Sequence, residues 1–365
     1  MVRIRRFLAV FVAAGFMIVG PLRAEDPVRP AADHDVKPLP VDPGSSLPGL
    51  GTGGDGDRPS LVQFGPMPLS PSASAGEEVD CNTSGVVAHA DWLLWRASPQ
   101  GLDFATIANP AAAAAGGGPL ATESLDFGRT NGIRAGVGYR FTTGWELLWD
   151  FTYFDSDAQQ KAVSSVGAAT VLLATHSFFN TTPMDSISAA GTFRLNLHDV
   201  DVSWGSCLNE TVDFRAFGGF RYAKIDEEFD TAYAYHLNPA TPVTGTIHMP
   251  LGMESNGIRI GAEFQWNTAG GLRVFGRAAQ SILVADFETR RVEADSFHGP
   301  ILDIPGNASR VVPVVEAAAG ISWRLGPLEA SGGYEMSNWF NMVDASLRSQ
   351  SLFIDGCFVR LAYVH

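Results

Sequence analysis

The sequence Gly-Ile-Arg-Ile-Gly-Ala-Glu-Phe-Gln-Trp-Asn, residues Gly257 to Asn267, decides the fold class. Apolar side chains occupy every second position from Ile258 to Trp266. Polar side chains or glycine occupy the positions between them, including Arg259. Because successive side chains of a strand point to opposite faces, this period of two predicts a β-strand with one apolar and one polar face.

The same period of two recurs along the chain after Cys81. It is clear at 132–141, 145–153, 212–222, 311–324 and 328–336, and weaker at 86–97, 191–204, 270–286 and 352–364. In the segment 191–204 the apolar positions change from odd to even numbers near Asp199, which we interpret as a β-bulge. Together the segments predict an all-β chain with ten strands.

The connections between these segments alternate in length. The short ones are 142–144, 205–210, 267–270 and 325–327, and the long ones are 98–130, 156–190, 227–256, 287–310 and 339–351. This pattern is typical of a transmembrane antiparallel up-and-down β-barrel with short periplasmic turns and long extracellular loops. A soluble barrel or sandwich is the alternative, since alternation alone does not say which face meets water.

Tryptophan favours the membrane barrel. One tryptophan lies beside each short connection, and indole rings prefer the membrane–water interface. We therefore expect an aromatic girdle made of Trp145, Trp204, Trp266 and Trp323. A second girdle near the long connections is expected from Trp95, Tyr153, Tyr222 and Phe287.

The N-terminus predicts export. Residues 1–24 combine basic Arg3, Arg5 and Arg6 with an apolar run and a small residue at Ala24, the pattern of a secretory signal peptide. An inner-membrane anchor is disfavoured, because a spanning helix needs roughly 20 apolar residues. Residues 25–80 hold ten of the 22 prolines and predict a disordered Pro/Gly-rich linker. The barrel is expected over 81–365, in the outer membrane.

Charge and cysteine content exclude other classes. The net charge is −14, which disfavours nucleic-acid binding. The three cysteines, Cys81, Cys207 and Cys357, are too few for a disulfide framework. One pair can oxidise after export, and one thiol must then remain.

The polar faces of the strands are expected to line the lumen. An arginine or lysine that faces lipid at mid-depth costs roughly 2–4 kcal/mol. The predicted pore-lining residues are Arg134, Arg140, Glu146, Asp150, Arg215, Arg221, Arg259, Glu263, Arg273, Arg277, Glu316, Arg324, Glu329 and Glu335.

Motifs for chemistry are sparse. The histidines have no ligand-spaced partners, so we predict no metal, no cofactor and no catalytic residues. His198 beside Asp199 is interpreted as a lumen or bulge residue. The pair Asp155 and Asp157 could serve a rim protease, but no Asp/His pair at suitable spacing accompanies it. The acidic run Asp226–Asp230 predicts a solvated loop or, alternatively, a site for divalent cations that bridge to lipid phosphates.

Several motifs, in order, give the chain a family resemblance. They are Ala-Asp-Trp-Leu-Leu-Trp at 90–95, Gly-Leu-Asp-Phe at 101–104, Gly-Ile-Arg-Ala-Gly-Val-Gly-Tyr-Arg-Phe at 132–141, Gly-Trp-Glu-Leu at 144–147, Phe-Gly-Gly-Phe-Arg-Tyr-Ala-Lys-Ile-Asp at 217–226 and Val-Val-Pro-Val-Val-Glu at 311–316. The chain resembles the pore-forming outer-membrane proteins typified by the Legionella major outer-membrane protein. The resemblance implies a barrel and a pore.

The resemblance implies a pore for ions or small solutes. The count of ten strands predicts that this pore is narrow, because about eight strands leave room only for side chains and general channels use 16 or so. A non-conducting structural or surface-interaction barrel is the alternative, and an enzyme is a third, weaker hypothesis. The expected partners are outer-membrane lipid and the barrel-assembly machinery, which commonly reads a C-terminal aromatic residue. Tyr363 is the candidate here.

Overall fold

The computed structural model describes residues 84–109, 121–164, 171–209, 211–344 and 347–364. The predicted signal peptide and linker lie outside these residues. Within them, no helix is long and apolar enough to cross a membrane. The helical segment that they contain is a single 3-10 turn, η1 (Ala269–Gly271).

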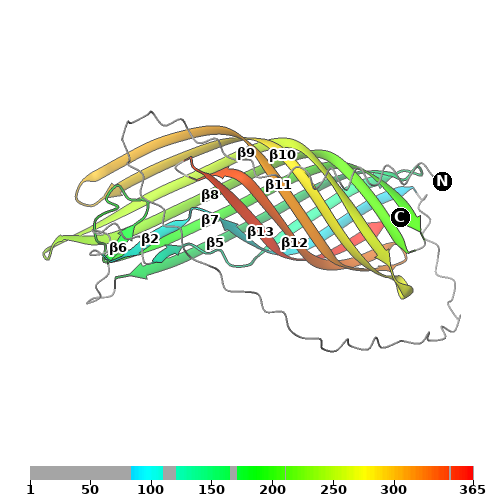
Figure 1. Cartoon of the computed structure of the whole chain (residues 1–365), viewed down its shortest axis with the longest axis horizontal. Coiled ribbons are helices and arrows are strands. Elements are labelled where there is room, and N and C mark those ends of the chain that lie inside the picture. Colours follow the sequence, from blue (N-terminus) through cyan, green and yellow to red (C-terminus); the bar gives the residue numbers. More distant parts are fainter. Residues whose placement is uncertain (1–83, 110–120, 165–170, 210, 345–346, 365) are drawn as a thin grey trace, which may run out of the picture. The chain divides into compact units, whose positions relative to one another are not determined.

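Ten strands close into one antiparallel barrel in the order β1-β13-β12-β11-β10-β9-β8-β7-β5-β4 (Figure 1). Their bounds are β1 Gly85–Pro99, β4 Thr130–Arg140, β5 Trp145–Val163, β7 Ser186–Asn209, β8 Val212–Asn238, β9 Thr241–Asn267, β10 Leu272–Asp295, β11 Gly299–Leu325, β12 Leu328–Val343 and β13 Ser349–Val364. Barrel strands that follow one another in the sequence pair in space, and β1 pairs with β13 to close the ring. The predicted ten-stranded up-and-down barrel is confirmed.

A second, three-stranded sheet belongs to the long connections. It contains β2 (Asp103–Ala108), β3 (Ala121–Ser124) and β6 (Val171–Ala174), in the order β3-β2-β6. Its apolar residues join the same buried cluster as the barrel wall. Figure 1 places β2 and β6 toward the ends of the strands where the long connections lie.

Several strands are much longer than expected. Strands β8, β9 and β11 each have 27 residues, and β7 and β10 each have 24. The segments 227–256 and 287–310, which we predicted to be loops, are therefore mostly strand, and they turn tightly near Pro239 and Phe297. Figure 1 shows these strands extending together at the long-loop end.

The polarity of the two faces inverts along each long strand. On β9, Ile258 and Ile260 face outward and are 63% and 60% exposed, while Arg259 between them is buried. Further along the same strand, Met249 and Leu251 are buried inside and His248 is exposed outside. We call the part near the short turns (257–267 on β9) the short-turn half, and the part beyond it (241–256) the loop half.

This inversion corrects one prediction. The strand β7 keeps continuous register with β5 and β8 through Asp199, and its register shift lies at Cys207 to Asn209. The change of apolar phase is therefore not a bulge. It marks the point where the strand passes from surroundings that suit an apolar outer face to surroundings that suit a polar one. Before Asp199 in the sequence, the apolar Leu195 faces inward. After Asp199, the apolar Val202 faces outward.

Candidate functional site

The interior of the short-turn half is charged. In this half of β9 the even-numbered positions carry apolar side chains and face outward, so the odd-numbered positions face the lumen. The same alternation on the other strands turns the predicted lumen residues inward. Arg324 differs from the others: it is only half-buried, and its Nε donates to the carbonyl oxygen of Gly326 in a short turn, 3.1 Å away. It therefore lies at the short-turn mouth of the barrel.

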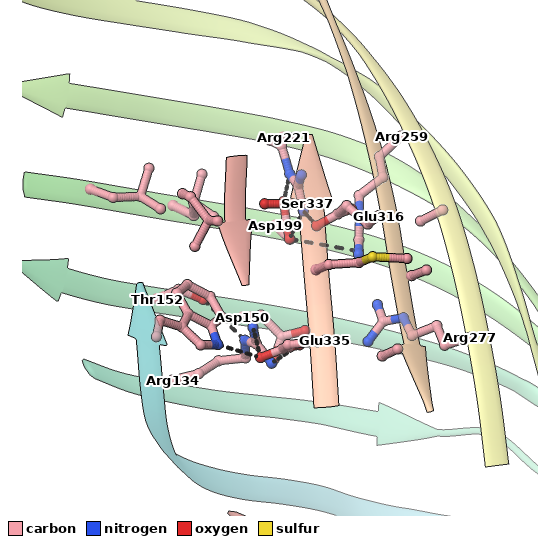
Figure 2. Close-up of a pocket in the computed structure, with 18 of the residues that line it drawn as sticks. Arg134, Asp150, Thr152, Asp199, Arg221, Arg259, Arg277, Glu316, Glu335 and Ser337 are labelled. Atoms are coloured by element: carbon pink, nitrogen blue, oxygen red, sulfur yellow. Dashed lines mark hydrogen bonds and ion pairs between the residues drawn. The ribbon is translucent and has the colours of Figure 1, made fainter. Parts of the chain in front are cut away.

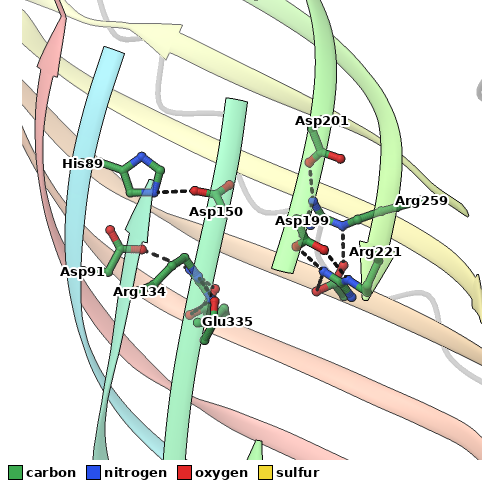
Figure 3. A network of polar contacts seen from close by, with 11 residues as sticks. His89, Asp91, Arg134, Asp150, Asp199, Asp201, Arg221, Arg259 and Glu335 are labelled. Carbon is green, nitrogen blue, oxygen red and sulfur yellow. Dashed lines mark hydrogen bonds and ion pairs between the residues drawn. The ribbon is translucent and has the colours of Figure 1, made fainter. Parts of the chain in front are cut away.

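One charged cluster is centred on Asp91, which is 3% exposed (Figure 3). Arg360 donates to both of its carboxylate oxygens at 2.7 and 2.8 Å, and Arg134 donates to Oδ2 at 3.1 Å. Arg134 also reaches Glu335 at 3.1 Å, and the indole of Trp95 donates to the same carboxylate at 3.0 Å. The cluster joins four neighbouring strands of the wall, β4, β1, β13 and β12, on their inward face.

A histidine–aspartate pair lies beside this cluster. His89 Nε2 is 3.0 Å from Asp150 Oδ1, and both side chains are nearly buried. Gly136 makes room for the pair, since a Cβ there would lie 2.1 Å from the Asp150 carboxylate and 2.3 Å from the imidazole. The glycine is therefore a condition for the contact between His89 and Asp150.

A second charged cluster lies on β7, β8, β9 and β11 (Figure 3). Arg221 makes a two-point contact with Asp199, with both N–O distances 2.7 Å, and it reaches Glu316 at 3.1 Å. Arg259 donates to Glu316 at 3.0 Å and also contacts Asp201. Two-point contacts of this kind fix geometry as well as charge.

Smaller pairs complete the short-turn half. The carboxylate of Glu146 forms an ion pair with Arg140 at 2.8 Å and a second ion pair with Arg215. Arg273 lies 3.4 Å from Glu329. Charges confined in this way are tolerable only when they are paired.

Between the clusters lies a cavity of about 60 Å³ (Figure 2). Arg134, Arg221, Arg259 and Arg277 line it, together with Asp150, Asp199, Glu316 and Glu335. A space of this size holds a few water molecules at most. The lumen of the short-turn half is therefore filled largely by side chains, and this small cavity, lined by charged and apolar residues, lies among them.

The interior of the loop half is apolar. Phe193 and Leu195 on β7, Ile225 on β8 and Phe287 on β10 are at most 1% exposed. Residues of the long connections complete this core: Leu125 and Phe127 lie against Gly191, an inward position of β7. The loop half is thus closed by wall side chains and by chain segments folded in from the connections.

One buried carboxylate holds part of the β6–β7 loop (175–185) against the wall. Glu293 on β10 is fully buried and accepts from Ser177 Oγ at 2.6 Å and from the Phe178 amide at 2.7 Å. It also accepts from Tyr233 Oη at 3.0 Å, and the neighbouring Arg291 donates to the carbonyl oxygen of His176. We call the contacts of Ser177 and Phe178 with Glu293 the loop anchor.

A second carboxyl group of the loop half has no such donors among the residues that the structure describes. Glu227 on β8 is 8% exposed and lies in a small pocket with His176 and Asp344. Burial and the charge of Asp344 raise the pKa of Glu227 to about 7. It therefore changes charge near neutral pH, inside the region that closes the barrel.

The four girdle tryptophans face outward beside the short turns. Their exposed fractions are 49% for Trp145, 41% for Trp204, 63% for Trp266 and 52% for Trp323. The second predicted girdle is partly wrong, because Trp95 and Phe287 are buried inside. The strands that carry Trp95 and Phe287 continue beyond the expected membrane–water interface. At the level of these two residues the side chains that face inward are apolar.

His198 does not face the lumen. It points outward and lies 6.1 Å from Trp149, 5.0 Å from Phe151 and 6.0 Å from Tyr222, measured between ring centroids. These rings form an aromatic group where the outer face turns polar. The interpretation of His198 as a lumen or bulge residue was wrong.

Sequence reasoning missed several inward charges. These are His89, Asp91, Asp199, Asp201 and Arg360. The period of two would have identified them: Asp199 and Asp201 alternate with Val200 and Val202, and Arg360 lies between Val359 and Leu361. The supposed bulge concealed the two aspartates.

The loop-half surface carries two Asp–His pairs that we did not predict. His248 contacts Asp230 and His236 contacts Asp185, each at 2.6 Å. All four side chains are about half exposed, and exposed pairs contribute little to stability. Across the described ranges, no group of three His, Cys, Asp or Glu side chains is placed to hold a metal ion. Cys207 is disulfide-bonded, and the free thiol belongs to Cys357.

Comparison with solved structures returns outer-membrane barrels at low identity. The outer membrane protease OmpT of Escherichia coli is 9% identical with a TM-score of 0.40, covering 77% of this chain and 96% of its own. Neisserial surface protein A is 9% identical with a TM-score of 0.26, covering 76% and 98%. The Pseudomonas putida toluene transporter TodX is 8% identical with a TM-score of 0.28, covering 77% and 90%.

The comparison with curated proteins finds no match. The family described as the Legionella pneumophila major outer membrane protein precursor matches residues 78–364, which include every strand of the barrel. The order of the sequence motifs, the ten-stranded ring and this match agree, and the chain belongs to the Legionella major outer membrane protein family.

Proposed function

We propose that this outer-membrane barrel is a narrow pore for ions or small solutes, closed in the state described here. The observation that carries the proposal is the charged interior of the short-turn half, with a polar cavity at its centre. A barrel that served only as a rigid anchor would gain nothing from burying so many charges, because burial of ion pairs is costly or neutral for stability.

The closure is made of parts that can move. In the short-turn half, side chains such as Arg259 and Glu316 fill the path. In the loop half, connection segments fill it, and the loop anchor holds one of them. Since loops open at lower free energy than the hydrogen-bonded strands of a wall, we expect opening to begin there.

Single-channel recording in planar bilayers tests the proposal. We expect small, intermittent conductance from the unmodified protein. Arg259→Ala should raise the conductance or the open probability, because it separates Glu316 from one of its partners. Lys224→Ala, which removes a charge from the outward face of β8, is the matched control and should have no effect.

Two outcomes would contradict the narrow pore. A large, steady conductance, as in general porins, would mean that the lumen is far wider than ten strands allow. No conductance from either the unmodified protein or Arg259→Ala would favour the second candidate, a non-conducting surface barrel. The apolar core of the loop half, enclosed by strands of up to 27 residues, is the observation that favours this candidate.

The cellular arrangement is part of the proposal. We infer that residues 1–24 are removed on export and that 25–80 form a linker before the barrel. Both ends of the barrel would then be periplasmic. An epitope inserted near Pro239 should be accessible to antibody on intact cells, and one near Thr143 should not. N-terminal sequencing of the mature protein should begin at Glu25.

The remaining expectations follow from surface chemistry. Lipid should contact the outward apolar band, and the assembly machinery should read the C-terminal strand. Divalent cations at Asp226–Asp230 stay a proposal: Asp226, Glu228 and Asp230 alternate on the outward face of β8, and Asp230 already contacts His248. Loss of this acidic face should leave conductance unchanged and alter only the response to a chelator.

A further inference from the structure

Glu227, on the inward face of β8 in the loop half, is a buried carboxyl group without a counterion among the described residues. It lines a cavity of about 10 Å³, which has room for one water molecule at most, so water hydrates a charge there poorly. Burial and the charge of Asp344 act on this carboxyl, and both favour its neutral form. The closed barrel is therefore best served by a protonated Glu227.

Three of the long connections meet at this cavity. Gln100 comes from the segment after β1, His176 from the β6–β7 loop and Asp344 from the β12–β13 connection. Apolar side chains of β8 and β9 close the other side. The Gln100 amide also donates to the carbonyl oxygen of Ser351 at 3.1 Å, which ties the first connection to the start of β13. Glu227 thus lies where the connections contact the wall, and a charge there acts on their closure.

The other titratable groups at the cavity do not compensate such a charge. Asp344 is fixed in a turn, where its carboxylate accepts from the Arg348 amide at 2.8 Å. Burial and the charge of Arg291 lower the pKa of His176, so this imidazole is neutral when Glu227 loses its proton. The remaining groups that line the cavity are amides, a glycine and apolar side chains. Deprotonation therefore places two negative charges in one buried space, beneath segments that can move away.

We propose that Glu227 is a proton-dependent switch of the connections: the neutral carboxyl lets them close over the loop half, and loss of its proton releases them. The pKa is raised from 4.5 to about 7 in the closed state, so closure is complete in mild acid and weakens as the pH rises through 7. With an ordinary pKa in the open state, the open population should rise roughly 70-fold between about pH 5 and about pH 8. The switch deepens the proposed function and rests on it only for the passage of solutes.

Native-state hydrogen exchange tests the switch without any conductance. The Gln100 amide reports the opening, because its hydrogen bond joins a connection to β13. The full-length protein is measured in lipid nanodiscs with EDTA, and protection factors remove the pH dependence of chemical exchange itself. We expect the protection of Gln100 to fall roughly 70-fold from about pH 5 to about pH 8. Glu227→Gln keeps the shape of the side chain and does not titrate, so its protection should not change with pH.

Glu228→Gln is the matched control, since Glu228 is the exposed, outward neighbour on β8 and should leave the full pH dependence in place. Asp344→Asn should move the fall to lower pH, because it removes the repelling charge, and it tests the switch even if Glu227→Gln does not fold. An equal fall in the unmodified protein and Glu227→Gln would overturn the proposal. So would protection that falls as the pH is lowered, which would assign the response to His176. Silent bilayers together with the expected exchange would reject the pore and leave the switch standing.

Discussion

Replacement of Glu293 by alanine should release the β6–β7 loop from the interior while the barrel stays folded. Glu293 accepts two hydrogen bonds from that loop, from Ser177 Oγ at 2.6 Å and from the Phe178 amide at 2.7 Å. The third donor, Tyr233, belongs to the wall. A hydrogen bond to a charged group contributes about 1.5–3 kcal/mol, so the two loop contacts together contribute about 3–6 kcal/mol.

Part of that energy is offset, because the variant no longer buries a carboxylate, and Arg291 still holds the carbonyl of His176. We therefore expect a net loss of about 3 kcal/mol from the closed loop, which raises its open population roughly 100-fold. Native-state hydrogen exchange at the Phe178 amide measures this directly. The Glu293→Ala variant should also show a higher open probability in bilayers.

Glu288→Ala is the control for this experiment, since Glu288 is an exposed residue of the same strand. It should change neither exchange nor conductance. Unchanged exchange at Phe178 in a folded Glu293→Ala barrel would refute the reasoning, because it would show that the apolar core alone holds the loop.

Three further predictions concern the wall and the core. The pKa of Glu227 is raised to about 7, so the folded state binds the proton of this carboxyl more tightly than the unfolded chain does. The free energy of unfolding should therefore fall as the pH rises from about 4.5 through 7, by up to about 3 kcal/mol. Urea unfolding at each pH measures this loss, and Glu227→Gln should abolish it. Ile260→Arg should destabilise the lipid-inserted barrel by roughly 2–4 kcal/mol, while Thr246→Arg, on the outward face of the loop half, should be nearly neutral in the same refolding assay. A Cβ at Gly257 would lie 2.0 Å from the Ile282 carbonyl oxygen, so Gly257→Ala should lower the melting temperature, whereas Gly252→Ala, where a Cβ meets nothing within 4 Å, should not.

The barrel could be predicted from the sequence because the features that specify it lie in short stretches of the chain. Alternation at 257–267 and short turns such as 325–327 are visible without any knowledge of contacts, and together they specify ten antiparallel strands. The lengths of the strands were missed for a physical reason. A period of two reports that two faces differ, but it does not report which face meets lipid, water or a core. Val243 and Met253 belong to the same strand as Ile258, yet they face the opposite way.

The candidate site was predictable in kind and not in detail. Arg221 and Arg259 were identified as lumen residues because lipid would not accept them. Their partners depend on cross-lumen contacts that span up to 95 residues of sequence, as between Arg221 and Glu316. The loop anchor at Glu293 lay in a segment that we expected to be loop, so no pattern pointed to it.

The central claim is that one strand passes through two environments and exchanges its apolar face between them. Nitroxide labels at positions 260 and 246 of β9 test it most directly, each in a Cys357→Ala background reconstituted in lipid vesicles. Both positions face outward. We predict that the label at 260 collides preferentially with oxygen, which partitions into lipid, and the label at 246 with a water-soluble nickel chelate. The same reagent preference at both positions would contradict the account.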